Sequence, residues 1–339
     1  MEFSSFLILD LPFVPPKEVA LCWNPFEIMN AYNTSKRMRN AIKSMSLKNK
    51  YKSVIHLSSL PKIILQGGGM GYSYLLERKH LNEDYQLPDS CPLNEEAINK
   101  MKIFFNDLVK VFGCRIQVVS LEEYNLCIGC VRLLMNWLIS LQTSIGVLRI
   151  ESIMENSNEI FYLTQKLKIK KGLFFRHFIS LSSWESFPMK FDVDFLQINK
   201  IDFKSWFPID TIIASNCIIF DLGNFWFSVE DMNRFIKSWI QGSNSRMKYF
   251  RVNIGFMDHQ RLIDGIKVFE NNESLRRSFT HQYDIPQLLD RFEFQGGSDI
   301  QSISGRRATF QQYPRVFHDE NGQVLERIVR RFQMVVWDD

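Results

Sequence analysis

Two short motifs have residue types and spacing that occur in metal, redox or phosphate-binding sites. Cys127 and Cys130 form a CxxC pair, and Gly67-Gly68-Gly69-Met70-Gly71 is a glycine run. A CxxC pair supplies half of a zinc site or a redox centre, and a glycine loop after a strand can hold phosphate with its backbone N–H groups. Zinc needs four ligands, and no second CxxC or HxxxH stands near this pair. A buried structural role is favoured for both cysteines, and a redox role stays open because the pair precedes an apolar helical segment.

The glycine run fits a phosphate loop poorly. Tyr72 stands where the G-x-G-x-x-G pattern needs its last glycine, and the Lys-Ser/Thr pair of a P-loop does not follow. Residues 80–92 are rich in turn formers, whereas a phosphate loop opens a long helix. The run is therefore predicted to be a flexible loop.

Other catalytic patterns are weaker still. The six histidines are dispersed, nothing local marks a nucleophile elbow, and the acid pair Glu122-Glu123 fits the first turn of a helix, where it complements the macrodipole. The sequence therefore predicts a protein that is not an enzyme, with no catalytic residue, no metal ligand and no cofactor.

Composition narrows the class of protein. The chain has 339 residues, which suggests about two domains, and 45% of them are apolar. A net charge of +4 is too mild to predict nucleic-acid binding. The start lacks the basic region of a signal peptide, and no stretch reaches the length of a membrane span. We expect a soluble protein of the cytoplasm and/or nucleus, with its six cysteines as free thiols.

The N-terminal block 6–42 is predicted to form three short helices. Pro15-Pro16 fits the start of the first helix, and Asn24-Pro25-Phe26-Glu27 combines an N-cap, an N1 proline and an acid at N3. Thr34-Ser35 marks the third start. Helices this short leave apolar surface uncovered and usually need a partner for stability. The block is therefore interpreted as a docking device.

This block resembles an F-box, in the form found in a large nematode-expanded family. The residues that carry the resemblance are Leu11-Pro12, Lys17-Glu18-Val19, Asn24-Pro25-Phe26-Glu27-Ile28-Met29 and Thr34-Ser35-Lys36-Arg37. The C-terminal half resembles the F-box associated domain of type 2. The similarity there is strongest at 227–233, 239–244 and 247–250.

The resemblance implies a substrate-recognition subunit of an SCF-type cullin-RING E3 ubiquitin ligase. The F-box would bind a Skp-type adaptor, and through it cullin, while the C-terminal domain would bind an unidentified protein target. The implied adaptor-binding residues are Leu11, Pro12, Val19, Phe26, Ile28, Met29, Ser35 and Lys36, the last two at the start of the last helix. Pro15-Pro16 departs from the family pattern, so an interaction module with a degenerate F-box, acting outside a ligase, is the alternative. An α/β enzyme using the glycine loop ranks third.

The middle of the chain alternates strand-like and helical patterns. Apolar residues recur at helical spacing in 95–112, 130–142 and 228–241. Strand-like runs occur at 115–121, 145–151, 174–181, 195–201, 217–222 and 247–254. This spacing is close to that of leucine-rich repeats, whose strand side forms a concave binding surface. An irregular leucine-rich-repeat-like strand–helix arc with a mainly parallel sheet is predicted, and a doubly wound open sheet is the alternative.

The C-terminal pattern differs. A short helix is predicted at 259–270, followed by strands at 292–294, 307–312, 315–318, 324–329 and 332–337 with a hairpin turn at 319–322. The expected fold class is α/β (α+β overall), an all-α F-box followed by the arc and an antiparallel β cap. The expected domains are 1–50, the F-box; 51–94, linking strands and a mobile Gly/Pro loop; 95–258, the repeat-like F-box associated region; and 259–339, the C-terminal helix and β cap.

Overall fold

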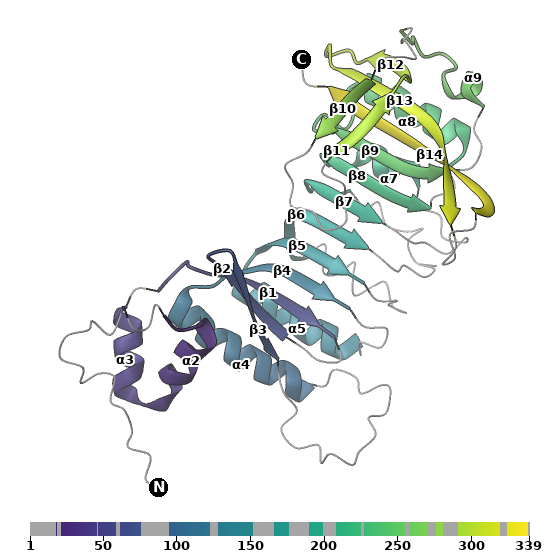
Figure 1. Cartoon of the computed structure of the whole chain (residues 1–339). Coiled ribbons are helices and arrows are strands. Elements are labelled where there is room, and N and C mark those ends of the chain that lie inside the picture. The colour runs from purple at the N-terminus through teal and green to yellow at the C-terminus, as the bar shows by residue number, and fades with distance from the viewer. Residues whose placement is uncertain are drawn as a thin grey trace. The chain divides into compact units, whose positions relative to one another are not determined.

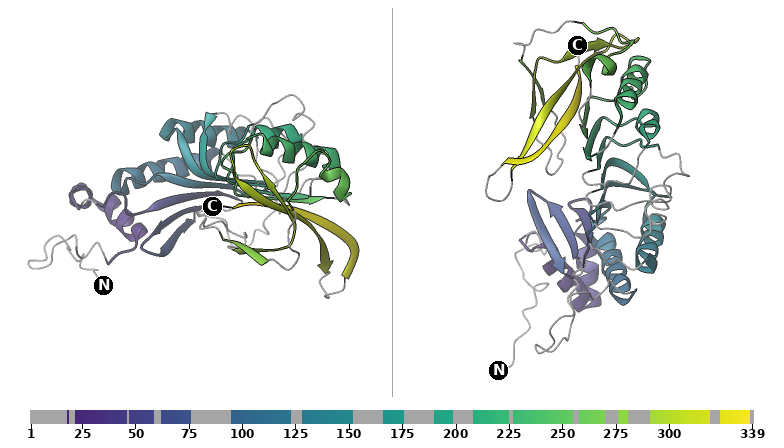
Figure 2. Two further views of the ribbon diagram at one scale, coloured as in Figure 1. Left: turned by 90° about the horizontal axis from the view of Figure 1, so that it is seen from above. Right: turned by 90° about the vertical axis from the view of Figure 1, so that its right-hand side faces the viewer.

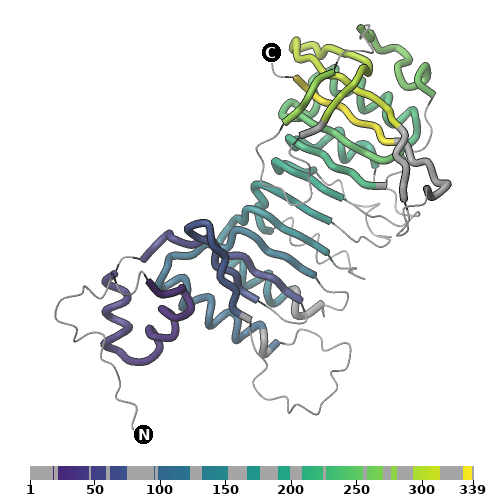
Figure 3. Tube along the Cα trace, in the orientation of Figure 1, coloured from purple at the N-terminus to yellow at the C-terminus, as the bar shows by residue number. Residues whose placement is uncertain are grey.

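The structure is a computed structural model of the whole chain (Figures 1 and 3). It forms two compact units, Met1–Ile169 and Lys170–Asp339. The residues that it describes are 18, 22–45, 47–58, 62–75, 95–122, 128–151, 166–175, 190–198, 208–224, 227–254, 258–269, 276–280, 291–318 and 324–337.

Two capped helices open the first unit. Helix α2 (Pro25–Thr34) begins at Asn24, whose side-chain oxygen accepts hydrogen bonds from the backbone N–H groups of Phe26 and Glu27, both at 2.9 Å. Glu27 returns the bond by accepting from the Asn24 N–H at 2.8 Å, which completes the predicted capping box. Helix α3 (Lys36–Ser44) follows at once, with Ser35 as its cap. The first of the three expected helices falls almost entirely outside the described residues.

The sheet of the first unit is mixed. Its strands run in the order β5-β4-β1-β2-β3, with β5, β4 and β1 parallel and β2 and β3 antiparallel. Their bounds are β1 (Lys52–Leu57), β2 (Lys62–Gly67), β3 (Met70–Leu75), β4 (Ile116–Leu121) and β5 (Ser144–Ile150). Helices α4 (Glu95–Phe112) and α5 (Ile128–Leu141) cover one face (Figure 2) and pack on each other, with the Phe105 and Trp137 ring centroids 5.6 Å apart.

The glycine run forms a tight turn. Gly68 and Gly69 lie between β2 and β3 with φ of +61° and +78°, the left-handed region that favours glycine. Residues 66–75 therefore belong to a hairpin and not to the flexible loop expected there. A strand follows the turn, so the glycine N–H groups are not at a helix N-terminus, where a phosphate loop would need them.

The sheet of the second unit is parallel on one side and antiparallel on the other. Strands β6 to β9 are parallel neighbours, and the order continues β9-β14-β13-β12 with antiparallel pairs. The bounds are β6 (Lys168–Phe175, mostly in this unit), β7 (Phe195–Ile198), β8 (Ile219–Asn224), β9 (Tyr249–Ile254), β12 (Ser298–Gln301), β13 (Arg307–His318) and β14 (Val324–Trp337).

The two faces of this sheet have different covers. Helices α7 (Ile209–Ala214), α8 (Val229–Ile240) and α9 (His259–Leu262) belong to this unit, and Phe235 of α8 packs on Phe250 at a centroid distance of 4.4 Å. A separate ribbon, β10 (Arg276–Thr280) paired with β11 (Arg291–Gln295), places Phe279 parallel to Tyr249 at 5.7 Å. Consecutive strand residues point to opposite faces, so α8 and the ribbon cover opposite faces (Figure 2). The Tyr249 face is called the helix-free face below.

Phenylalanine fills the core of the second unit. The rings of Phe220, Phe250, Phe332 and Phe310 follow one another across β8, β9, β14 and β13, with successive centroid distances of 5.9, 6.0 and 5.7 Å. All four side chains are at most 1% exposed. Burying one such ring contributes roughly 1.5–3 kcal/mol, so the row is a substantial stabilising element of the unit.

The predicted fold class is confirmed. The structure is mixed α/β, with N-terminal helices, then alternating strands and helices, then antiparallel strands. The helix expected at 95–112 has those bounds. The strand expected at 174–181 begins earlier, as β6 (Lys168–Phe175), where Lys168 and Lys170 alternate with buried Ile169. Residues 176–181 lie outside the described residues.

Other C-terminal boundaries were also predicted wrongly. The helix expected at 259–270 stops after one turn, and Gly265 then adopts φ of +67°. The runs 307–312 and 315–318 form one strand, β13, and 324–329 and 332–337 form one strand, β14. Pro314 does not end β13, because beyond Phe310 that strand pairs with β14 alone and a proline is tolerated on the unpaired side.

Gly297, between β11 and β12, and Gly305, between β12 and β13, both have positive φ. Comparing them tests the packing around Gly297. A Cβ on Gly297 (φ +103°) would lie 2.8 Å from the Phe310 carbonyl oxygen, whereas one on Gly305 (φ +88°) would meet nothing within 4 Å. Gly305→Ala should cost about 1 kcal/mol of unfolding free energy from backbone strain. Gly297→Ala should cost roughly 1–3 kcal/mol more, because the added methyl group also overlaps backbone. Urea denaturation followed by circular dichroism measures both, and equal losses would contradict the assigned contact.

Candidate functional site

The residues implied to bind an adaptor divide into three groups by their place in the structure. Leu11, Pro12 and Val19 lie outside the described residues. Ser35 and Lys36 stand at the junction of α2 and α3, where both side chains are exposed and the Ser35 hydroxyl accepts the Met38 N–H at 3.1 Å. These two positions are at the start of α3, and their contact with an adaptor remains a prediction.

The three implied residues of α2 face the first unit itself. Ile28 and Met29 are 2% and 1% exposed. The Phe26 ring is partly exposed, and its centroid lies 5.3 Å from that of Tyr74 and 6.2 Å from that of Phe104. Helix α2 is therefore held on β3 and α4 by the residues that the family resemblance assigns to a partner.

Among the described cysteines, Cys22 is free and exposed, whereas the other two are buried. Cys127 and the side chain of Cys130 lie outside the described residues, so the CxxC interpretation is untested. Cys114 and Cys217 are buried, and burial raises the pKa of each thiol to about 12, which keeps both protonated. Within the described ranges, no cluster of His, Cys, Asp and Glu could hold a metal ion, and no helix is long and apolar enough to span a membrane.

A polar cluster in the first unit was missed by the sequence analysis. Glu122 directly follows β4, not a helix start as expected, and its carboxylate lies 2.5 Å from Nδ1 of His56 on β1. The Ser120 hydroxyl donates to the same carboxylate at 3.0 Å. Burial alone would raise the pKa of Glu122, but the His56 hydrogen bond and charge, Ser120 and the charge of Lys62 together lower it. Since Ser120 bonds the acid and not the imidazole, these residues do not form a relay that activates a nucleophile.

A buried polar row crosses the parallel strands of the second unit. Gln197, Asp221 and Arg251 are direct neighbours in the strand register on the helix-free face. The Asp221 carboxylate accepts hydrogen bonds from Nε and Nη2 of Arg251, at 2.6 and 2.5 Å. It also accepts one from the Gln197 amide at 2.9 Å. Asp221 is 2% exposed and Gln197 3%. Burial alone would lower the pKa of Arg251, but the charge and hydrogen bonds of Asp221 raise it.

The sequence held a signal for this row. Each of the three strands has a polar residue between two large apolar ones: Leu196-Gln197-Ile198, Phe220-Asp221-Leu222 and Phe250-Arg251-Val252. A polar residue flanked in this way in a strand buried on both faces needs a partner on the next strand. Identifying the partner requires the register, which the repeat spacing alone does not fix.

A second row lies two residues further along the same face. Asn253, Arg331 and Tyr313 are register neighbours on β9, β14 and β13. Gln333 lies beside Arg251, and its side-chain oxygen accepts from the Tyr313 hydroxyl at 3.3 Å and from the Tyr249 hydroxyl at 3.5 Å. Burial raises the pKa of Tyr249 far above its ordinary value, so this phenol stays protonated as a donor.

The ribbon is fastened at the edge of this face by one ionic cluster. Arg277 on β10 donates two hydrogen bonds to Asp299, at 3.1 and 3.0 Å, and one to the Thr309 hydroxyl at 2.7 Å. The Trp337 indole N–H donates to the same hydroxyl at 2.7 Å, and the Arg277 guanidinium lies 5.4 Å from the indole centroid. These contacts join β10 to β12, β13 and β14, and they satisfy the charge of Asp299.

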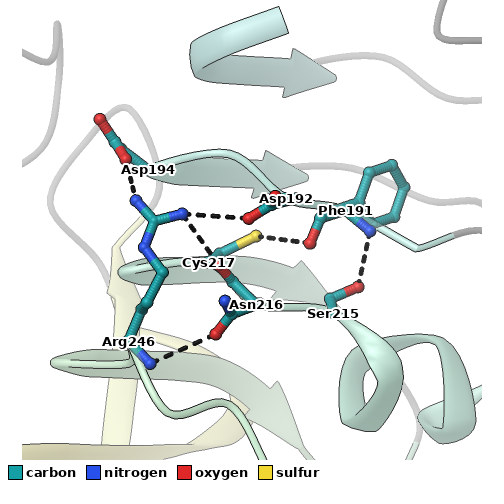
Figure 4. A network of polar contacts seen from close by, with 7 residues as sticks. All are labelled: Phe191, Asp192, Asp194, Ser215, Asn216, Cys217 and Arg246. Atoms are coloured by element: carbon teal, nitrogen blue, oxygen red, sulfur yellow. Dashed lines mark hydrogen bonds and ion pairs between the residues drawn. The ribbon is translucent and has the colours of Figure 1, made fainter. Parts of the chain in front are cut away.

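The opposite, amino-terminal end of the parallel strands carries a structural network (Figure 4). Arg246 forms ion pairs with Asp194 and, at 3.1 Å, with Asp192, both just before β7. Its backbone N–H donates to the Asn216 side chain at 3.2 Å. The Ser215 hydroxyl accepts the Phe191 N–H at 3.0 Å. These contacts join the segments that precede β7, β8 and β9, so the network has a structural role.

Comparison with known proteins identifies one region. Residues 187–252 match a protein family described as F-box associated. The match covers β7, α7, β8, α8 and most of β9, and therefore includes the Gln197–Asp221–Arg251 row. No curated protein and no solved structure matches the chain.

The buried ion pair makes a sharp prediction. Arg251→Met should lower the unfolding free energy of the second unit by about 3–5 kcal/mol, because Asp221 is left as an uncompensated buried charge. Arg234→Met is the matched control: Arg234 pairs with Asp210 and Asp231 at the surface and is 53% exposed, so its loss should cost at most about 1 kcal/mol. Similar losses in the two variants by urea denaturation would be inconsistent with a buried, neutralised Asp221.

The lowered pKa of Glu122 predicts a pH dependence. A carboxylate whose folded-state pKa lies below its ordinary 4.5 stabilises the fold above that pH, and loses this contribution as pH falls through the folded-state value. Glu122→Gln should therefore cost about 1–2 kcal/mol at neutral pH, and the difference from the native chain should shrink below pH 4.5. Urea denaturation over this pH range checks the prediction, and a pH-independent difference would refute it.

Proposed function

We propose that this protein is a non-catalytic substrate-recognition subunit of an SCF-type cullin-RING E3 ubiquitin ligase. The observation that carries the proposal is the match of residues 187–252 to the F-box associated family. It lies downstream of an N-terminal segment, 6–42, that resembles an F-box. The N-terminal segment would bind a Skp-type adaptor and through it cullin, and the C-terminal unit would hold a protein target, in the cytoplasm and/or nucleus.

The burial of α2 refines how the adaptor would be bound. Ile28 and Met29 are buried and cannot contact an adaptor directly. Their role in adaptor binding would be to fix the position of α2 by packing within the first unit. Leu11, Pro12 and Val19 would supply the direct apolar contacts, with Ser35 and Lys36 at the exposed start of α3. The first three residues are aliphatic or cyclic apolar groups, which gain the most from leaving water in an interface.

One observation favours the alternative, an interaction module with a degenerate F-box that acts outside a ligase. Phe26, Ile28 and Met29 already find apolar partners within the first unit. A helix whose apolar side is covered by its own unit needs no adaptor for stability. The two functions differ in a single measurable property, which is the recovery of adaptor and cullin with the full-length chain.

Affinity purification tests the proposal. The tagged full-length protein should recover a Skp-type adaptor and cullin, and Leu11→Ala should weaken purified adaptor binding roughly 10–100-fold, because one buried leucine contributes about 1.5–3 kcal/mol. Phe26→Ala should weaken binding as well, together with a loss of stability of the first unit, since its ring packs beside Tyr74.

The matched control is Leu141→Ala, the same substitution at a leucine of α5 that is 37% exposed. It should leave adaptor recovery unchanged. If the full-length protein recovers neither adaptor nor cullin, the ligase function is wrong and the interaction module replaces it. If Leu11→Ala binds adaptor as the native chain does, the assignment of that residue is wrong.

A further inference from the structure

Arg331 is a partly buried cation on the helix-free face. It lies on β14 between Asn253 of β9 and Tyr313 of β13. Figure 1 shows β14 beside β9 and β13. Asn253 is 9% exposed, whereas Arg331 and Tyr313 each keep a larger part of the side chain accessible. The row therefore has one buried residue, Asn253, and two partly exposed residues, Arg331 and Tyr313.

Two neutral groups fix the orientation of the guanidinium. Its Nε donates to the Asn253 side-chain oxygen at 3.3 Å, and Nη1 donates to the Tyr313 hydroxyl at 3.2 Å. The guanidinium carbon lies 5.8 Å from the centroid of the Tyr313 ring, within cation–π range. The Arg331 side chain is thus held in one geometry before any partner arrives, which reduces the entropy lost on binding.

No carboxylate of the described residues neutralises Arg331. The two acids whose contacts are known on this face are already paired, Asp221 with Arg251 and Asp299 with Arg277. Arg331 has hydrogen bonds only to the uncharged Asn253 and Tyr313 within the described part of the chain, and Nη2 has no acceptor there. A partly buried cation without a counter-charge is costly, and an anionic oxygen from a partner would offset that cost.

We propose that the helix-free face around Arg331 binds an acidic protein segment, with a carboxylate or another anionic oxygen of that segment on the Arg331 guanidinium. Charge complementarity selects this occupant, since the fork of N–H groups on arginine matches an oxyanion and charge-assisted hydrogen bonds are the strong ones. Tyrosine and arginine are also two of the three residue types enriched in interface hot spots, the third being tryptophan. The inference rests on the proposed function, which it deepens by naming the chemical class of the protein target.

Direct binding of three peptides to the full-length protein tests the proposal. The probes are a fluorescein-labelled glutamate-rich peptide, the same peptide with glutamine at every glutamate, and the same peptide with phosphoserine at one glutamate. The glutamate peptide should bind at least about tenfold more tightly than the glutamine peptide, with affinity falling as salt rises. The phosphoserine peptide shows whether phosphate or carboxylate is the better anion. Equal binding of the charged and uncharged peptides overturns the proposal.

Substitutions locate the binding to this row. Arg331→Met keeps an unbranched apolar stem but removes the guanidinium, and it should reduce affinity for the glutamate peptide about tenfold, toward that of the glutamine peptide. Arg276→Met, at an exposed arginine of β10 in the same unit, should leave affinity unchanged. If Arg331→Met does not fold, Arg331→Lys decides: it keeps the charge and loses the fork, so weakened binding at unchanged Tm supports the proposal and unchanged binding overturns it.

The outcome is separable from that of the proposed function. Arg331→Met should recover adaptor and cullin as the native chain does, because the substitution lies in the second unit and the implied adaptor residues lie in the first. If the native chain recovers no adaptor yet binds the glutamate peptide through Arg331, the ligase function fails and the acidic-segment site stands. If adaptor is recovered and Arg331→Met binds the peptide unchanged, only the site is wrong.

Discussion

The carboxylate of Asp221 sets the strictest requirement in the second unit. It is almost fully buried in the middle of a parallel sheet, so it must lie opposite both Gln197 and Arg251. A slip of one residue in either neighbouring strand would turn these partners to the helix side and leave the charge unpaired. The register of β7, β8 and β9 is therefore fixed by an electrostatic condition as well as by apolar packing. Because β14 pairs with β9, the same register also places Arg331 opposite Asn253.

Features determined by local interactions could be predicted from the sequence. The start of α2 follows from the side chains of Asn24 and Glu27, and α4 follows from apolar spacing over Glu95–Phe112. Features that join distant segments could not be predicted. The His56–Glu122 contact joins residues 66 positions apart, and the insertion of β14 between β9 and β13 depends on pairing across the unit. The ribbon was missed except at β11, because its place is set by Arg277 and Phe279 and not by a turn signal.

The candidate sites show the same limit in another form. The resemblance to an F-box implied that Phe26, Ile28 and Met29 contact an adaptor, but apolar residues on a short helix can equally pack on their own chain. In the structure the first unit covers Ile28 and Met29. The polar triplets of β7, β8 and β9 were likewise visible one strand at a time. Their alignment shows that Asp221 is neutralised by Arg251. The pairing of β14 with β9 and β13 places Arg331 between the neutral Asn253 and Tyr313, with no carboxylate partner among the described residues.

The position of β14 has a consequence for synthesis of the protein. In the sheet it lies directly beside β9, yet β10 to β13 are all translated before it. Until β14 has left the ribosome, the backbone N–H and C=O groups along one edge of β9 have no partner in the sheet, and Phe250 lacks the ring of Phe332. An unpaired strand edge beside uncovered aromatic surface is a template for aggregation. A nonsense mutation before β14 would thus produce a truncated chain with its parallel strands complete and the edge of β9 unpaired. Such a chain would be a substrate for chaperones and proteases.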